Sequence, residues 1–437
     1  MRQADCREAE FTQRQPVAHF RRCAVAVNAA ERRGHGTGRG RDGMAESWDI
    51  VIVGGAATGA SAAWWASGME PDARILVLEP DPTYARSATA LSVASVRSQF
   101  SNPVNVRISR FGAEFIRDFG AKVGPEGGVP SLGLTENGYL FLTGTETGAA
   151  TMEELAEMQR GLGAGTVVLD GPELARRFPW MKLDDVVAGS FGPRDEGWFD
   201  NMGLVAGFRR AARARGVTFR AERATALVAG EGGRVSGVAM ASGESIAAGA
   251  VLLAAGTGVT GLLATLGEEW PVEARKRTVF VVDAPEARHP DAPLIVDHKG
   301  NYLRPEHAPC VVGPVPPEDG PCDLGDFEPD HAQFEEIVWP CLWNRAEGFA
   351  ASKVKRLWAG HYDFNRLDQN AILGPHPRWT GLFVASGFSG HGLQQAPAVG
   401  RGMAELMLTG GYRTLDLSDL GVARVLEGRA FAEKAIV

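Results

Sequence analysis

A chain of 437 residues and 46.6 kDa exceeds what one hydrophobic core usually organises, so we expect two domains, or one interleaved with another. A hydrophobic fraction of 44% with 22% charged residues is ordinary globular composition and excludes disorder for most of the chain. The formal net charge of −8 argues against a nucleic-acid partner, which needs a basic face.

The first residues have the composition of a tail. Residues 1–43 contain nine Arg, no Lys and five acidic residues, which fits a transit peptide poorly, and they lack the apolar core of a signal peptide. We expect residues 1–47 to be a disordered extension or a segment upstream of the true start, with Met44 as an alternative first residue. The five cysteines form an odd set without a Cys-x-x-Cys pair. They favour a reducing compartment, so the cytoplasm is expected, with peripheral membrane attachment as an alternative.

The first motif is a strand, a glycine turn and a helix. Residues 48–53 form a β-branched run typical of a buried parallel strand, and the turn at residues 54–59 reads Gly-Gly-Ala-Ala-Thr-Gly. This pattern explains the uncharged stretch up to Met69 better than a membrane span does. A pyrophosphate needs such a turn because it must approach unpaired N–H groups at a helix N-terminus.

A carboxylate follows at the expected distance. The next strand, residues 74–78, ends at Glu79, which suits a carboxylate accepting the ribose hydroxyls of an adenosine. Ala56 puts a methyl group where the usual pattern has its second glycine, which weakens the match without breaking it. The motif predicts an FAD or NAD site, and a tight structural turn is the alternative.

A second glycine loop lies near the C-terminus. A strand at residues 381–386 leads into Gly387-Phe388-Ser389-Gly390-His391-Gly392, and a helix is expected over residues 393–408, with Pro397 in its first turn. This loop is a second candidate binding site for negative charge, and one bound dinucleotide would explain both glycine loops. Donors aimed at N1 and the C2 carbonyl oxygen of a flavin would stabilise its reduced form. The alternative is a tight connection that packs a terminal helix.

Four segments resemble a known family. The loop at 387–392 and residues 252–256, 358–363 and 368–377 resemble the D-amino-acid oxidase and sarcosine oxidase superfamily of FAD enzymes, from about Trp48 to the C-terminus. Residues 95–101 and 394–397 look closest to the branch that contains a mitochondrial FAD-dependent oxidoreductase-domain protein implicated in complex I assembly, and its bacterial relatives.

The resemblance implies a fold and an activity. The fold would be a Rossmann-like α/β FAD domain of the hydroxybenzoate-hydroxylase type, interleaved with an α+β substrate domain that contains an antiparallel sheet. Residues 48–100, 190–270 and 358–430 would form the FAD half, and residues 101–189 and 271–357 the substrate half. Members of the family oxidise C–N bonds of amino acids and N-alkylamines.

The expected cofactor is non-covalent FAD. The residues predicted to bind it are Gly54, Gly55, Ala56, Thr58, Gly59, Glu79, Ser87, Ala224, Gly256, His361, Gly387, Ser389, Gly390, His391 and Gly392. By resemblance His361 aligns with a cysteine that holds the flavin covalently in some members, and an unlinked strand histidine is expected here. The nine histidines show no metal-ligand spacing, so no metal is predicted.

The catalytic candidates are Arg97, Tyr302, Arg304, His391 and Gln394. Arg97 precedes Asn102-Pro103, which is expected to start a helix, and by resemblance it matches a substrate-side arginine. Such a contact to a carboxylate contributes about 1.5–3 kcal/mol. A surface arginine, or one bound to the cofactor, is the alternative.

The other candidates follow from the resemblance. Tyr302 and Arg304 are expected on a substrate-domain strand that faces the flavin, with a core tyrosine as the alternative. His391 is expected beside the flavin rather than as an essential base. Gln394 stands where some oxidases carry a carboxylate-binding lysine, and Val311 approximately where they carry an oxygen-activating lysine. The missing cation favours a dehydrogenase over an oxidase.

The sequence therefore predicts an FAD-dependent oxidoreductase that oxidises the C–N bond of an amino acid or N-alkyl amino acid by hydride transfer to flavin N5. Electrons would pass to an acceptor protein or a quinone. An oxygen-using oxidase of the same substrates is one alternative. A flavoprotein with an assembly or electron-transfer binding role is the other.

Overall fold

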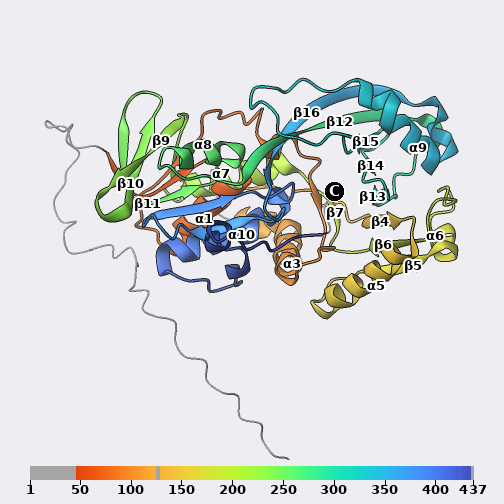
Figure 1. The fold of residues 1–437 in the computed structure, drawn as a ribbon, viewed down its shortest axis with the longest axis horizontal. Helices are drawn as coiled ribbons and strands as arrows, with labels where there is room; N and C mark the ends of the chain where they lie inside the picture. Colours follow the sequence, from red (N-terminus) through yellow and green to blue (C-terminus); the bar gives the residue numbers. More distant parts are fainter. Residues whose placement is uncertain (1–45, 125–127, 435–437) are drawn as a thin grey trace, which may run out of the picture.

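The computed structural model describes residues 46–124 and 128–434, which form two β-sheets with helices around them (Figure 1). Of the extension predicted at residues 1–47, residues 1–45 lie outside the described part of the chain. The first sheet has the order β17-β18-β11-β1-β2-β8, and the hairpin of β9 and β10 joins it through β11. Its strands are β1 (Ser47–Val53), β2 (Ile75–Leu78), β8 (Thr218–Arg220), β9 (Ala224–Gly230), β10 (Arg234–Met240), β11 (Ser245–Leu253), β17 (Ile372–Pro375) and β18 (Leu382–Ser386).

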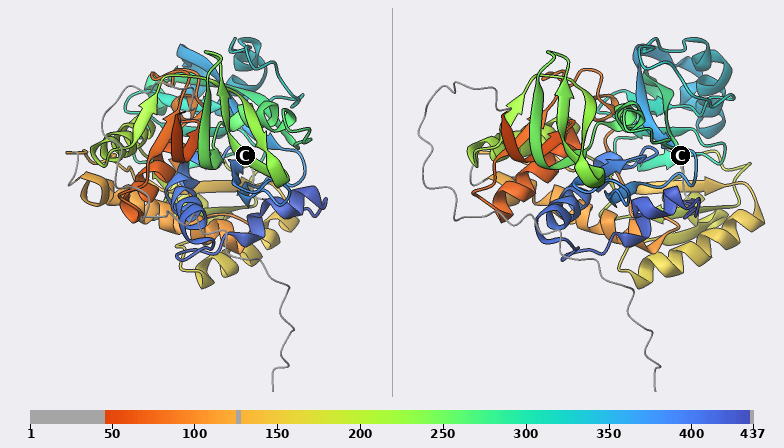
Figure 2. Two further views of the ribbon diagram at one scale, coloured as in Figure 1. Left: turned by 90° about the vertical axis from the view of Figure 1, so that its left-hand side faces the viewer. Right: turned by 60° about the vertical axis from the view of Figure 1, so that its left-hand side comes forward.

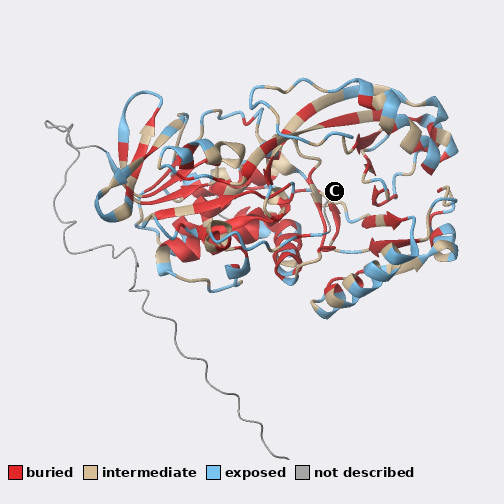
Figure 3. Cartoon of the chain, viewed as in Figure 1, coloured by how far each residue is buried: buried red, intermediate tan, exposed pale blue. Residues whose placement is uncertain are grey.

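The central strand of this sheet is β1, which pairs in parallel with β2 and β11. Its side chains alternate between two cores: Ile50 and Ile52 face one, and Val51 and Val53 face the other. The apolar run at residues 50–53 fits a strand that is covered on both faces. Figure 3 shows these strands as an almost continuous buried layer.

Helices cover both faces of the first sheet. The core on one face joins side chains from α1 (Ala57–Met69), α3 (Pro103–Arg117), α4 (Phe119–Val123), α7 (Asn201–Ala214) and α10 (Gly392–Thr409). The opposite core includes α8 (Val259–Ala264), α11 (Val422–Leu426) and the hairpin of β9 and β10. Because α1 packs between α7 and α10, it is apolar on all sides rather than on one stripe.

The second sheet has the order β16-β12-β15-β14-β13-β4-β6-β5 and is antiparallel except where β13 pairs with β4. Its strands are β4 (Tyr139–Thr143), β5 (Val167–Asp170), β6 (Ala188–Gly192), β12 (Val272–Asp283), β13 (Leu294–Val296), β14 (Tyr302–Pro305), β15 (Cys310–Gly313) and β16 (Lys353–Asn365). The helices α5 (Glu146–Gly161), α6 (Gly171–Arg177) and α9 (Trp339–Arg345) lie on its outer side (Figure 2). Between the sheets are α2 (Ala88–Leu91) and the short pair β3 (Ser95–Val96) and β7 (Gly197–Trp198).

The architecture confirms the predicted fold class, a Rossmann-like α/β half interleaved with a half built on an antiparallel sheet. The division differs from the predicted one in detail. Helix α3, assigned to the substrate half, packs its apolar face into the core of the first sheet. Strand β16, assigned from residue 358 to the FAD half, pairs with β12 along its whole length because both strands cross between the halves. Strand β6 belongs to the second sheet, although the FAD half was predicted to resume at residue 190.

One local prediction was wrong. Helix α10 begins at Gly392, so Pro397 is its sixth residue and lies beyond the first turn. Because proline has no N–H, the carbonyl of Leu393 loses its usual helical partner. The Trp65 indole N–H of α1 donates to the Pro397 carbonyl at 3.0 Å, which helps to hold the two helices together at this point.

Candidate active site

A cavity of about 800 Å³ lies between the two sheets. The FAD half contributes residues that follow the carboxyl ends of β1, β2, β11 and β18, where open parallel sheets bind ligands. The substrate half contributes side chains from β4, β12, β13, β14 and β16. The cavity is therefore walled by both halves, and its size suits a large ligand together with a small one.

The first glycine loop brings the start of α1 against the end of β1. Gly54 has φ of +100°, and a Cβ there would lie 2.3 Å from the Ala254 carbonyl oxygen. A Cβ on Gly59 would lie 1.8 Å from the Gly54 carbonyl oxygen, so both positions require glycine. The first N–H groups of a helix have no acceptor within it. Ala56 and Thr58 line the cavity, so this helix end and its positive dipole face the ligand.

Glu79 lies at the same end of the cavity. Its carboxylate accepts the N–H of Gly55 at 3.0 Å and the N–H of Asp81 at 3.0 Å. Burial raises the pKa of Glu79, while these two N–H groups oppose the rise. Each carboxylate oxygen keeps a further lone pair, so the group can still accept the hydroxyls of a ribose.

Asp363 on β16 holds the second glycine loop in place through hydrogen bonds. The Asp363 carboxylate accepts the N–H of Gly387 at 2.7 Å, and its backbone carbonyl accepts the N–H of Ser389 at 2.9 Å. Burial raises the pKa of Asp363 to about 6. Nothing lies within 4 Å of a Cβ placed on Gly390, so this backbone faces open cavity at the start of α10.

Most of the predicted cofactor residues meet at this one cavity. Those that line it are Gly54, Ala56, Thr58, Glu79, Ser87, Ala224, Gly256, His361, Ser389, Gly390, His391 and Gly392. Gly55, Gly59 and Gly387 lie behind this lining and shape the two loops. Two helix N-termini and one carboxylate along a single cavity fit a dinucleotide such as FAD.

The end of the cavity opposite Glu79 brings together three of the catalytic candidates, Arg97, His391 and Gln394. The Arg97 guanidinium donates to His391 Nε2 at 3.2 Å, and the Arg97 backbone N–H donates to Gln394 Oε1 at 2.7 Å. The guanidinium lies 4.3 Å from the ring centre of Phe100 and 5.1 Å from that of Phe141. Burial, then the charge of Arg97, lowers the pKa of His391 to about 3. The imidazole is therefore neutral, with its proton on Nδ1.

The structure separates Tyr302 from Arg304. Tyr302 is partly buried and lines the cavity, and burial raises the pKa of its hydroxyl. Arg304 does not line the cavity: its guanidinium pairs with Glu306, and its Nε donates to the Val93 carbonyl at 3.2 Å. Of the two, only Tyr302 is placed to meet a ligand.

Sequence reasoning missed the residues of the substrate sheet. Tyr139 on β4, Leu294 on β13 and Arg277 on β12 also line the cavity. Arg277 donates to both oxygens of Asp319, at 2.7 and 2.9 Å, and to the Tyr362 hydroxyl at 2.6 Å. These residues carry no motif. A charged residue in the middle of a long strand was the one signal that could have drawn attention to Arg277.

Two glycine loops around one cavity define a dinucleotide-binding protein with a second, substrate-facing wall. A model of the DAO family, described as FAD dependent oxidoreductase, matches residues 49–406. The chain therefore belongs to the DAO family of FAD-dependent oxidoreductases, and its cofactor is FAD.

Relatives and solved structures agree with this family. The chain is 38% identical over 432 residues to the FAD-dependent oxidoreductase domain-containing protein 1 of Bos taurus, covering 90% of this chain and 87% of that protein. It is 22% identical to the peroxisomal sarcosine oxidase of Homo sapiens, with 86% and 96% covered. The structure of L-proline dehydrogenase from P. horikoshii superposes with a TM-score of 0.78 at 24% identity, covering 89% of this chain and 100% of that one. The resemblance seen in the sequence is confirmed.

Two kinds of feature are absent from residues 46–124 and 128–434. In these ranges no helix combines the length and apolar character needed to cross a bilayer. Within the same described part of the chain, no three His, Cys, Asp or Glu side chains gather as metal ligands would. The cytoplasmic location stays a prediction.

Proposed function

We propose that the protein is a dehydrogenase that oxidises the C–N bond of an amino acid or N-alkyl amino acid. FAD supplies the acceptor for the hydride at its N5 atom. The substrate carbon would lose its hydride and the nitrogen a proton, giving an imine that water hydrolyses. The observation that carries the proposal is Arg97, a buried guanidinium at the cavity wall beside the second glycine loop.

Arg97 suits the anchoring of a carboxylate. It lies among the aromatic rings of Phe100, Tyr139 and Phe141, which exclude water and strengthen its field. The side-chain oxygen of Gln394 accepts the Arg97 backbone N–H, so the side-chain amide of Gln394 offers its N–H groups as uncharged donors. Tyr302 offers a hydroxyl that stays protonated because burial raises its pKa.

Two features support a dehydrogenase with non-covalent FAD. Val311, which aligns with an oxygen-activating lysine, is a buried apolar residue in β15. His361 lies with Nε2 2.5 Å from the Asp326 carbonyl and its ring stacked on Phe327, so this nitrogen already has a partner. Electrons would then pass to an acceptor protein or a quinone, and an oxygen-using oxidase is the alternative.

A binding role is a second candidate. Trp339 and Trp343, one turn apart on α9, are 41% and 40% exposed at the far end of the substrate half. Exposed tryptophans are unusual on a protein without partners. In an assembly or electron-transfer role, this face would meet the partner.

The test is anaerobic reduction of the bound flavin by a panel of amines. Each amino acid and N-methyl amino acid is paired with its neutral amide, and bleaching near 450 nm is followed in wild type, Arg97→Met and Arg304→Met. Arg97→Met should raise KM for the acids by about 10- to 100-fold, the equivalent of a charge-assisted contact, and change KM for the amides little. Arg304→Met, which removes an arginine that does not line the cavity, should leave both unchanged.

Three outcomes would contradict the proposal. Equal effects of Arg97→Met on acids and amides would remove the anchoring role. Bleaching by no compound would favour the binding role. Rapid reoxidation of the reduced protein by air would replace the dehydrogenase with an oxidase.

A further inference from the structure

A second buried carboxylate lies directly behind Arg97. Glu196, just before β7, is 1% exposed and does not line the cavity. Its Oε1 accepts the Ser98 N–H at 2.9 Å, and its Oε2 accepts from Gln99 Nε2 at 2.8 Å. The carboxylate therefore binds the two residues that follow Arg97 in the chain.

Gln99 extends this hydrogen-bond network to the second sheet. Its Nε2 also donates to the Tyr139 carbonyl on β4 at 2.9 Å, and its Oε1 accepts from the Ser190 hydroxyl on β6 at 2.6 Å. The segment that carries Arg97 is thus tied to β4, β6 and β7 through one carboxylate and one amide. Fully paired buried networks of this kind hold a backbone in one position.

The charged surroundings of Glu196 are sparse. Arg97 is the cation whose charge acts on it, and Asp195, itself paired with Arg117 and so partly neutralised, opposes ionisation. The Tyr139 hydroxyl also faces it and stays protonated because burial raises its pKa. Burial outweighs the hydrogen bonds from Gln99 and Ser98 and raises the pKa of Glu196 to about 7. Its charge therefore changes near neutral pH.

We propose that Glu196 is a positioning residue: it fixes the backbone that carries Arg97, and its negative charge weakens the attraction of Arg97 for a substrate carboxylate. The inference rests on the proposed function, in which Arg97 is the anchor. Glu196 itself touches neither the substrate nor the flavin.

The sign of the pH effect follows from this arrangement. At pH 6 Glu196 is mostly protonated and does not offset the charge of Arg97. At pH 8 Glu196 is ionised and offsets part of that charge. One pKa unit of coupling corresponds to a tenfold difference in affinity between fully protonated and fully ionised Glu196, so a carboxylate should bind about fivefold more tightly at pH 6 than at pH 8. Its binding near pH 7 should take up protons.

The experiment titrates the FAD-loaded protein with acetate and with its neutral analogue acetamide. Calorimetry from pH 6 to 8, in two buffers of different ionisation enthalpy, gives affinity and proton uptake. The variants are Glu196→Gln, Arg97→Met and the control Glu268→Gln, which changes a buried carboxylate that accepts from Trp379 Nε1 at 2.8 Å and does not line the cavity. Wild type and Glu268→Gln should bind acetate with the fivefold pH dependence between pH 6 and 8, the consequence of one pKa unit of coupling, and with proton uptake. Glu196→Gln should lose both, and acetamide should show neither in any variant.

The outcomes separate this inference from the proposed function. If acetate binding depends on Arg97 but wild type takes up no proton, the inference is overturned, and this result stands even if Glu196→Gln fails to fold. An unchanged pH dependence in folded Glu196→Gln also overturns it. If Arg97→Met binds acetate as wild type does, or wild type binds none, the anchoring role of Arg97 fails, and the inference fails with it.

Discussion

The two walls of the cavity differ in the groups that face a ligand, which are backbone groups on one side and side chains on the other. On the FAD side, backbone groups dominate: the glycine loops after β1 and β18 present helix N-termini, and the Glu79 carboxylate lies beside the first of them. On the substrate side, the wall consists of side chains such as Tyr139, Arg277 and Tyr302, each from a different strand. The comparison teaches that a backbone site restricts the sequence locally, whereas a side-chain site depends on how distant strands pair.

The largest expected effect comes from a side chain added to the backbone wall. In Gly59→Val, the new Cβ would lie 1.8 Å from the Gly54 carbonyl oxygen, and neither backbone can move without separating α1 from β1. We expect a loss of bound flavin and a destabilisation above about 4 kcal/mol. The ratio of absorbance at 450 nm to that at 280 nm and the thermal midpoint measure the two effects.

Gly261→Ala is the matched control. Gly261 lies in α8, and nothing lies within 4 Å of its Cβ position. This change should stabilise the helix by about 0.5–1 kcal/mol and leave the flavin bound. A Gly59→Val protein that kept its flavin would show that the first loop is not the phosphate seat.

The contrast also explains what the sequence could disclose. The strand before Gly54, the helix after it and the carboxylate at Glu79 all lie within one short segment, so their pattern predicted the loop, and the structure places it at the cavity. The same holds for residues 387–392. Both loops need glycine for steric reasons, and such a requirement is visible in the sequence itself.

The substrate wall could be predicted only in part. Tyr302 and Arg304 were both expected to face the flavin. Tyr302 lines the cavity, whereas Arg304 does not, because Glu306 and the Val93 carbonyl bind its guanidinium. Tyr139 and Arg277 were missed because their place depends on the pairing of β4 with β13 and of β12 with β16. Glu196 gave no sequence signal, since its importance arises from burial.

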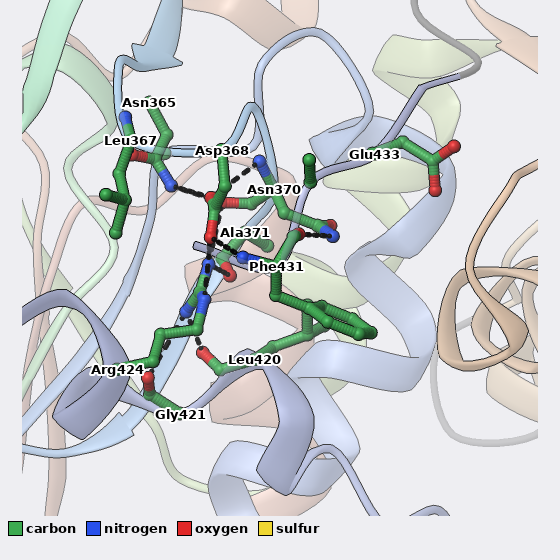
Figure 4. A network of polar contacts seen from close by, with 12 residues as sticks. Asn365, Leu367, Asp368, Asn370, Ala371, Leu420, Gly421, Arg424, Phe431 and Glu433 are labelled. Atoms are coloured by element: carbon green, nitrogen blue, oxygen red, sulfur yellow. Dashed lines mark hydrogen bonds and ion pairs between the residues drawn. The ribbon is translucent and has the colours of Figure 1, made fainter. Parts of the chain in front are cut away.

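The second-largest effect, a loss of stability, is expected from the side-chain network that supports the FAD side (Figure 4). Arg424 donates to both Asp368 oxygens, at 2.9 and 3.2 Å, and to the Ala371 carbonyl at 2.9 Å, with both side chains almost fully buried. In Arg424→Met the Asp368 carboxylate stays buried without its cation, which should cost about 3–5 kcal/mol. Chemical denaturation measures the loss. The flavin should remain bound in the folded fraction if the backbone loops alone hold it.

An exposed pair provides the comparison for that variant. Arg429 and Glu427 form an ion pair with side-chain exposures of 65% and 56%. Arg429→Met should change the free energy of unfolding by less than about 1 kcal/mol. If Arg424→Met released the flavin from folded protein, the FAD side would depend on side chains as the substrate side does, and the contrast between the walls would weaken.

The smallest expected effect tests the substrate wall alone. Tyr302→Phe removes one hydroxyl from the cavity, and no backbone loop depends on it. Flavin occupancy should stay at the wild-type level, while KM for the best amine substrate should rise by roughly two- to tenfold, the worth of one neutral hydrogen bond. Because burial raises the pKa of Tyr302, its hydroxyl stays protonated, so wild type and variant should have the same pH profile between about pH 6 and 10. Tyr412→Phe, which removes a hydroxyl remote from the cavity, should change neither quantity. A loss of flavin in Tyr302→Phe would mean that the substrate wall also binds the cofactor, and the two walls would then form a single site.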